Sequence, residues 1–108
     1  MSVLKELQKQ LVEFGEKRDW RQYHSPKNLA MALNVECGEL LELFQWHTEE
    51  QSKQASKDER QAAGEELADI LMYSLLLADA LDIDIESATK AKLKLNESRF
   101  PPNSNEST

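Results

Sequence analysis

Glycine and proline are scarce in this sequence, with three of each among 108 residues, and two of the prolines are adjacent at Pro101 and Pro102. Folds built from many short strands need these residues in their turns, so the scarcity argues against an all-β protein. The chain is also short for two hydrophobic cores. We therefore predict a single domain of long helices.

Cysteine and long apolar runs are scarce as well. Cys37 is the one cysteine, which excludes an intrachain disulfide and a cysteine-rich zinc site. Its position in an apolar helical stripe predicts a buried side chain. No stretch approaches the about 18 apolar residues of a membrane span, and the opening MSVLKELQKQ is charged, unlike a secretory leader. We expect a cytoplasmic protein without a membrane partner.

Basic residues are outnumbered, with 13 Lys and Arg against 20 Asp and Glu and a formal net charge of −7. Such a surface repels polyanions, which argues against a nucleic-acid polymer as partner. A small polyphosphate bound to a divalent cation is a different case. The cation masks much of its charge and is itself attracted to carboxylates.

Apolar residues recur at helical spacing and predict four helices. Ser25 before Pro26 is a helix start, with serine as the cap and proline in the first turn. Ser56 with Glu59 forms a capping box, and Asp84 opens the last helix. The predicted segments are about 2–19, 25–47, 56–81 and one beginning at 84, with residues 48–57 interpreted as a linker.

These helices are expected to form a four-helix bundle over residues 1–100, followed by a flexible tail at 101–108. The third helix is apolar on more than one side, and a chain of this length buries a modest fraction of its surface. We therefore expect an oligomer. The stripe assigned to the core of the third helix is Leu67, Ile70, Leu71, Ser74, Ala78 and Leu81, with Leu75, Leu76 and Leu77 off it.

Acidic residues lie three positions apart on two consecutive predicted helices, Glu36 with Glu39 and Glu66 with Asp69. Residues at this spacing project from the same side of a helix, one turn apart. Both pairs adjoin apolar positions, so four like charges should meet at the edge of the core, where they repel strongly. Magnesium would relieve this repulsion, because it takes oxygen ligands and keeps exchangeable waters.

Acidic pairs at this spacing are also common on solvated helix surfaces, and either pair alone would be interpreted so. Two pairs on the core side of consecutive helices favour the metal site, and the lack of histidine beside them argues against a di-iron bundle. Gly38 and Gly64 adjoin the pairs and indicate either a close approach of the helices or merely tolerated glycines. Glu42, Glu49, Glu50 and Glu65 are interpreted as surface charge.

The sequence resembles the MazG-like superfamily of all-α nucleoside triphosphate pyrophosphohydrolases, whose signature is E-x-x-E on one helix and E-x-x-D on the next. The similarity spans about Arg18 to Pro101 and is to the branch that includes the small dCTP pyrophosphatases. It is carried by RDWRQYHSPKNLAMALNVECGELLELFQW, EELADILMY and KLKLNESRFP. An ordered set around the first acidic pair is more specific than the pairs alone: Trp20, His24, Pro26 and Asn28 before it, and Phe44, Gln45 and Trp46 after it.

The resemblance implies that the four acidic residues are catalytic and bind Mg²⁺, with Mn²⁺ as a possible substitute. Water would attack the α-phosphorus of dCTP or a related deoxynucleotide, and pyrophosphate would leave. Glu39 and Glu66 both stay open as the proton acceptor. The resemblance also implies a homotetramer of two tight dimers with pockets shared between chains, and a role in cleansing the nucleotide pool.

Substrate-binding residues are implied in the same way. Trp20, Trp46 and Tyr73 match positions that line the nucleotide pocket, although each aromatic taken alone fits a core or interface position better. His24 is interpreted equally as a phosphate or base contact and as a loop residue that caps the second helix. Some relatives carry a histidine where Leu11 stands here, which leaves base preference open. A set on the last helix, Lys92, Asn96 and Arg99, resembles one that reaches phosphate and sugar.

Alternatives remain at this point. The same chemistry could act on dUTP, a modified nucleotide or a phosphoribosyl nucleotide. A noncatalytic helical interaction module would instead pair the carboxylates with basic groups of a partner. A nucleic-acid binder is least compatible with the charge.

Overall fold

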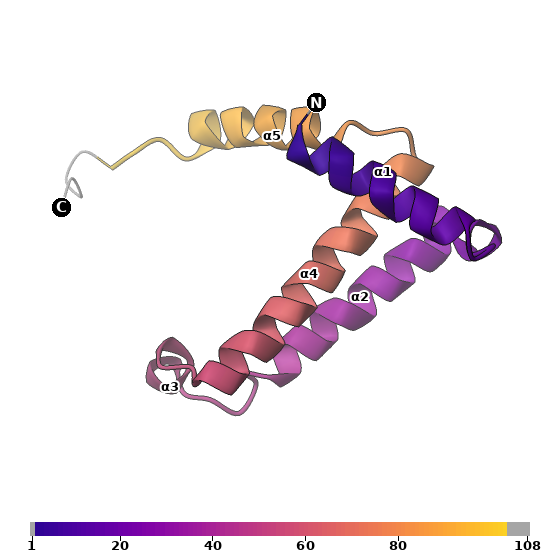
Figure 1. The fold of residues 1–108 in the computed structure, drawn as a ribbon. Coiled ribbons are helices and arrows are strands. Elements are labelled where there is room, and N and C mark those ends of the chain that lie inside the picture. The colour runs from indigo at the N-terminus through magenta and orange to yellow at the C-terminus, as the bar shows by residue number, and fades with distance from the viewer. Residues whose placement is uncertain (1, 104–108) are drawn as a thin grey trace.

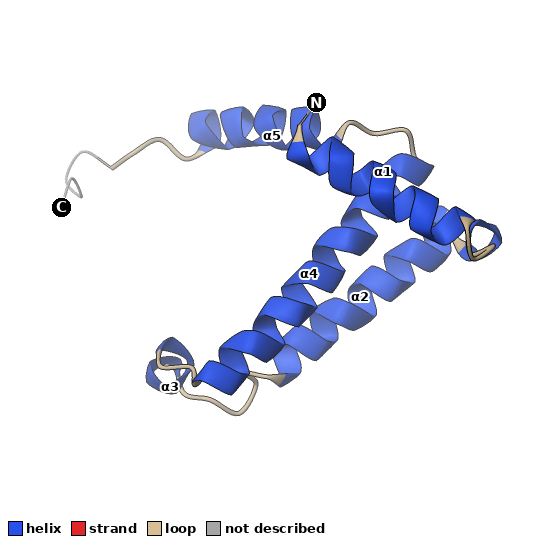
Figure 2. Ribbon diagram, viewed as in Figure 1, coloured by secondary structure: helices blue, strands red, loops and turns tan. Residues whose placement is uncertain are grey.

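The computed structural model describes residues 2–103, which form helices and connecting loops without a strand (Figure 1). Figure 2 shows how little of this range is loop. The all-α prediction is confirmed, whereas the predicted tail lies, from Ser104 onward, outside the described residues. The elements are α1 (Val3–Glu16), a 3₁₀ turn η1 (Arg21–Tyr23), α2 (Pro26–Glu42), α3 (Glu49–Lys53), α4 (Lys57–Ala80) and α5 (Ile85–Arg99).

Side-chain caps begin the main helices where the sequence predicted them. The Ser25 hydroxyl accepts a hydrogen bond from the backbone N–H of Asn28 at 3.2 Å, which starts α2. At α4, the Ser56 hydroxyl accepts from the N–H of Glu59 at 3.1 Å, and the Glu59 carboxylate accepts from the N–H of Ser56 at 2.8 Å. These bonds satisfy amides that have no partner within the helix.

The segment predicted as a linker, residues 48–57, contains the short helix α3, so that prediction was wrong. The hydroxyl of Thr48 accepts from the N–H of Gln51 at 3.1 Å, and the Gln51 side chain accepts from the N–H of Thr48 at 2.9 Å. The prediction relied on apolar periodicity, which a short polar helix lacks. The capping box itself was present in the sequence.

Helices α2 and α4 lie side by side and antiparallel, and α1 crosses α4 near its C-terminal end (Figure 1). The buried apolar residues of these three helices are Leu29 of α2 and Leu75 and Ala78 of α4, which are 2%, 1% and 3% exposed. The predicted core stripe of α4 was wrong in part, because Leu67, Leu71 and Leu81 are exposed, whereas Leu75, which was placed off the stripe, is buried. Both α1 and α2 pack on α4, and a helix that is apolar on several sides does not reveal which side they choose.

Two polar contacts fix α1. The Gln8 side-chain amide donates to the backbone carbonyl of Leu75 in α4 at 2.9 Å. Near the N-terminus, the Lys5 ammonium lies 3.4 Å from the carboxylate of Asp84, the residue that caps α5. The pKa of Asp84 is lowered, chiefly because its carboxylate accepts from the N–H of Ser87 and further because of Lys5. Together these contacts hold α1 across the end of α4.

Helix α5 projects from the remainder of the chain (Figure 1), and none of its residues is buried. Leu93 and Leu95 are both exposed on it. Within residues 2–103, helices α1, α2 and α4 therefore pack together, and α5 extends beside them. No helix in this range is long and apolar enough to cross a membrane.

One further expectation is corrected, and one question that the sequence left open is decided. Cys37 is exposed rather than buried, so a place beside apolar residues on a helix did not put it in the core. A methyl group added to Gly38 or to Gly64 would meet no other atom within 4 Å, so neither glycine marks a close approach of α2 and α4. Both glycines therefore fit the alternative interpretation, in which a glycine within a helix is merely tolerated.

Candidate metal and nucleotide site

Three of the four predicted acidic residues meet between α2 and α4. Glu36, Glu39 and Glu66 each place a carboxylate oxygen within 4.8 Å of the others. The i, i+3 spacing brings the first two to the same side of α2, and the antiparallel contact brings α4 opposite them. Asp69 lies beside this cluster. It lines the same cavity as Glu36, and its charge contributes to the raised pKa of Glu36.

The cluster is electrostatically unfavourable without a counterion. The pKa of Glu36 is raised, chiefly because its carboxyl shares a hydrogen bond with that of Glu66, then because burial disfavours its charged form. The pKa of Glu39 is raised, chiefly by a hydrogen bond to Glu36 and then by the charge of Glu36. Each close pair therefore favours a retained proton.

Two oxygen atoms of the cluster have no hydrogen-bond partner within the described range, although both are buried. They are Oε2 of Glu36 and Oε2 of Glu66. Buried acceptors without partners are rare in proteins and call for a donor or a cation. An all-oxygen set of carboxylates suits a hard divalent cation, so these residues fit such an ion.

A cavity of about 260 Å³ adjoins the cluster and runs between α1, η1 and α4. It brings Trp20, His24 and Tyr73, for which the resemblance implied a substrate-binding role, together with Glu36 and Asp69. Tyr73 is one helical turn after Asp69, which places both on the cavity side of α4. The full lining is Leu11, Phe14, Gly15, Trp20, His24, Glu36, Asp69, Met72, Tyr73 and Leu76.

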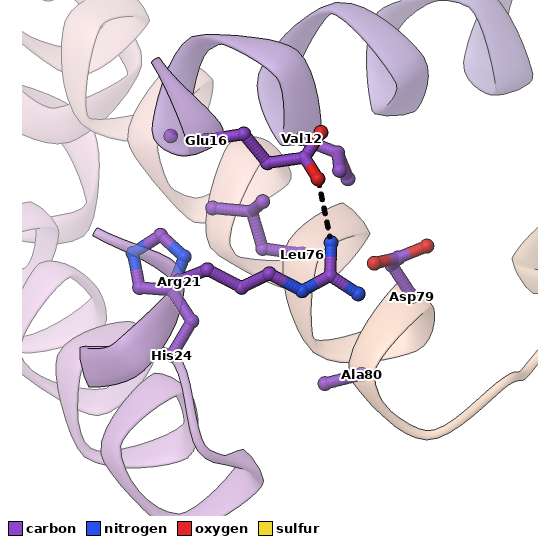
Figure 3. Close-up of a pocket in the computed structure, with 8 residues that line it drawn as sticks. Val12, Glu16, Arg21, His24, Leu76, Asp79 and Ala80 are labelled. Atoms are coloured by element: carbon purple, nitrogen blue, oxygen red, sulfur yellow. Dashed lines mark hydrogen bonds and ion pairs between the residues drawn. The ribbon is translucent and has the colours of Figure 1, made fainter. Parts of the chain in front are cut away.

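His24 is half-buried and lines two cavities. A methyl group on Gly15 would stand 3.5 Å from Cε1 of its ring, so the ring lies directly against the backbone of α1. Its second cavity holds about 50 Å³ and is shown in Figure 3, where the Arg21 guanidinium turns to the carboxylate of Glu16. Ser25 caps α2, so the interpretation of His24 as that cap was wrong.

Four predicted substrate-binding residues lie outside this cavity within one chain. Trp46 follows the end of α2 and is 86% exposed. The others stand on α5, which projects away from α1, α2 and α4 (Figure 1). The residues that the structure does not bring to the cavity are Trp46, Lys92, Asn96 and Arg99.

Phe14 and Met72 are lining residues that sequence reasoning missed. Both are apolar residues within predicted helices, and neither was assigned to the site from the sequence. Their positions were the available signal, because Phe14 lies in the last turns of the helix that precedes Trp20, and Met72 adjoins Tyr73. An apolar residue at the end of a stripe can contact a ligand as well as a core, which periodicity does not distinguish.

Comparison with known proteins finds a matching family and several similar proteins. A sequence model described as the MazG-like family matches residues 31–108. The dCTP pyrophosphatase 1 of Homo sapiens is 43% identical over 101 residues, which cover 92% of this chain and 59% of that protein. The Bos taurus protein of the same name is 44% identical, with 92% and 60% covered. The chain thus spans about 60% of the length of these curated relatives.

A solved structure shows the same fold at comparable length. A pyrophosphatase from Archaeoglobus fulgidus superposes with a TM-score of 0.87 and is 37% identical in sequence. The superposition covers 94% of this chain and 95% of the archaeal one.

Proposed function

Because the chain belongs to the MazG-like family, we propose that it hydrolyses a nucleoside triphosphate to the monophosphate and pyrophosphate, with Mg²⁺ as cofactor. The observation that carries this proposal is the carboxylate cluster beside the cavity. Glu36 and Glu66 each bury an oxygen atom without a partner there, which a protein interior tolerates poorly unless a cation or a proton arrives.

In this proposal Glu36, Glu39, Glu66 and Asp69 hold the cation. Bound Mg²⁺ would neutralise phosphate charge and acidify the attacking water, as in other phosphoryl-transfer sites. Glu39 is the exposed member of the cluster. Solvent reaches its carboxylate, so we assign it as the group that accepts the proton of the attacking water and returns it to bulk solvent.

The substrate we propose is dCTP or a closely related deoxynucleotide. The relatives named dCTP pyrophosphatase 1 support this choice, and the cavity offers Trp20 and Tyr73 as surfaces for a base. Aromatic rings bind any base by its face, so they favour nucleotides without selecting one. The lining at Leu11 is apolar, so discrimination depends on the remaining polar groups, of which His24 is one.

We further propose a homotetramer built from two dimers, with each site completed by a second chain. No lysine or arginine from residues 2–103 lines the cavity, although a triphosphate carries several negative charges. Lys92 and Arg99 stand on α5, none of whose residues is buried within the described part of the chain. A second copy could bring α5 and the exposed Trp46 to the site. An apolar groove between α1 and α4, of about 420 Å³, offers contact area.

A panel of ribo- and deoxynucleoside triphosphates with pyrophosphate detection tests the proposal. We expect Mg²⁺-dependent turnover that is greatest for dCTP or a related deoxynucleotide. Glu39→Gln should reduce kcat by at least about 100-fold while helical circular dichroism is retained. Glu65→Gln is the matched control, because Glu65 is an exposed neighbour of the cluster.

A folded protein that cleaves none of these triphosphates, with Mg²⁺ or Mn²⁺ present, would refute the proposal. The noncatalytic interaction module would then be the better interpretation. Equal turnover by Glu65→Gln and Glu39→Gln would refute the assignment of the cluster rather than the activity.

A further inference from the structure

Phe14 and Trp20 form an aromatic pair at the cavity, and they come from the end of α1 rather than from the acidic helices. Their ring centroids are 5.5 Å apart and their planes are inclined by 68°, an edge-to-face contact. Both rings line the cavity, yet they are 46% and 44% exposed. The pair therefore presents uncovered aromatic surface to whatever enters.

The turn that ends α1 builds this pair. Trp20 donates its backbone N–H to the carbonyl of Gly15 at 2.9 Å, and Asp19 donates to that of Glu16 at 3.2 Å. Asp19 has a φ of 57°, the left-handed conformation. These are the bonds of a Schellman motif, in which the residue after the left-handed one contacts the last helical turn. The motif places Trp20 against Phe14.

Arg18 holds the pair from outside. Its guanidinium carbon lies 3.5 Å from the centroid of the Phe14 ring and 6.0 Å from that of Trp20. Its Nη1 also donates to the backbone carbonyl of Phe14 at 3.0 Å, at the end of α1. Arg18 is not among the residues that line the cavity. The planar guanidinium of Arg18 thus covers one face of the Phe14 ring and also hydrogen-bonds to the backbone of the same residue.

We propose that Arg18 is a positioning residue for the nucleobase: it holds Phe14 and Trp20 as the aromatic wall against which the base of the substrate binds. This inference rests on the proposed function. Arg18 touches neither the carboxylates nor the cavity, so it acts through the rings. A base can pack against these two rings. A phosphate group gains nothing from them, because apolar rings offer it neither a hydrogen-bond donor nor a positive charge.

Arg18→Met tests the inference by removing the planar charge at similar length. We expect KM for dCTP to rise about 3- to 10-fold while kcat stays within about twofold, because the wall contacts the base and not the reacting atoms. Inhibition by dCMP should weaken by the same factor, and inhibition by pyrophosphate should stay unchanged. Arg18→Lys keeps a cation over the ring and should recover part of the loss.

Arg21→Met is the matched control. Arg21 is three residues away, but its guanidinium pairs with Glu16 at 3.3 Å in the separate small cavity (Figure 3). Loss of this charge should leave KM for dCTP unchanged. A rise in KM equal to that of Arg18→Met would show an effect of net charge alone and would overturn the inference.

A spectroscopic readout does not depend on turnover. The indole N–H resonance of Trp20, assigned by comparison with Trp20→Phe, should move in Arg18→Met and stay in place in Arg21→Met. Titration with dCMP should shift this resonance in the wild type, with weaker affinity in Arg18→Met. If Arg18→Met fails to fold, the same measurements on Arg18→Lys and Phe14→Leu decide the question.

The outcomes separate the two proposals. A wild-type protein that cleaves no triphosphate refutes the proposed function. An active wild type in which Arg18→Met leaves KM, dCMP affinity and the Trp20 resonance unchanged refutes the inference alone. A fall in kcat with unchanged KM would also refute it, because the residue would then act on the chemical step.

Discussion

Glu36 and Glu66 face each other across the contact of α2 and α4, with a carboxylate oxygen of each within 4.8 Å of the other, and each has its Oε2 atom buried without a hydrogen-bond partner among the described residues. A proton on Glu36 would relieve this arrangement, and the pKa of Glu36 is accordingly raised, chiefly by Glu66. Burial of two acceptors in this way costs stability unless a cation replaces the proton. The stability of the protein should therefore respond to both pH and Mg²⁺.

Thermal unfolding measured against pH without metal should show the cost of this cluster. Glu36 and Glu39 have raised pKa values in the folded state, so folding favours their protonated forms. Their contribution is thus most favourable at low pH, and stability falls as pH rises from about 4.5 through the raised pKa values. In Glu66→Gln this fall should be shallower, because the repulsion by Glu66 is gone, whereas Glu65→Gln should behave as wild type.

Magnesium should remove the same cost at neutral pH. A cation that binds only the folded site stabilises it by about 2.7 kcal/mol at 100 times its dissociation constant. We expect a concentration-dependent rise in Tm with MgCl₂ in the wild type and none in Glu36→Gln or Glu66→Gln beyond that given by NaCl at equal ionic strength. An equal Mg²⁺ response in all three proteins would contradict the metal assignment.

The capping box of α4 should support stability at neutral pH and lose part of its effect in acid. The pKa of Glu59 is lowered, chiefly by the backbone N–H of Ser56 and further by His47, whose Nε2 lies 2.9 Å from the carboxylate. Its contribution is present above the ordinary pKa near 4.5 and is lost as pH falls through the lowered value. Glu59→Gln should show a smaller loss of Tm over that acidic range. Ser56→Ala should cost about 1 kcal/mol at neutral pH, by chemical denaturation.

Leu75 and Leu71 are matched leucines on α4 with opposite surroundings. Leu75 is 1% exposed, so Leu75→Ala should cost about 2–5 kcal/mol in unfolding free energy. Leu71 is exposed and lines the apolar groove between α1 and α4. Leu71→Ala should change unfolding of the isolated chain little, and Leu71→Glu should instead lower the oligomeric state seen by light scattering. A monodisperse wild-type monomer would contradict the proposed assembly.

Mixing of two inactive variants tests whether α5 acts across chains. In the proposed assembly, one copy supplies the carboxylates and its partner supplies Lys92. Glu66→Gln and Lys92→Ala should each lose activity, and co-refolding them should restore about a quarter of the wild-type sites, as random pairing in a two-fold dimer requires. No recovery in mixed oligomers would mean that Lys92 serves its own chain or has no role.

Local chemistry let the sequence predict much of this protein. The caps at Ser25, Ser56 and Asp84 stand where their hydroxyl or carboxylate groups predicted them, because a cap involves residues only three apart. The acidic pairs share a side of their helices for the same reason. The sequence resemblance to the MazG-like family also pointed to the fold that the structure shows.

What the sequence determined by itself is therefore the all-α class, the helix starts and the acidic character of the site, since each follows from neighbours within one turn. Only the tertiary structure decided that Leu75 is buried while Cys37 and Leu71 are exposed, and that Phe14 meets Trp20 at a cavity. These outcomes depend on the angle at which α1 crosses α4 and on how the chain turns at Asp19. Apolar periodicity gives a helix its apolar sides, but the packing of its neighbours selects which side is covered.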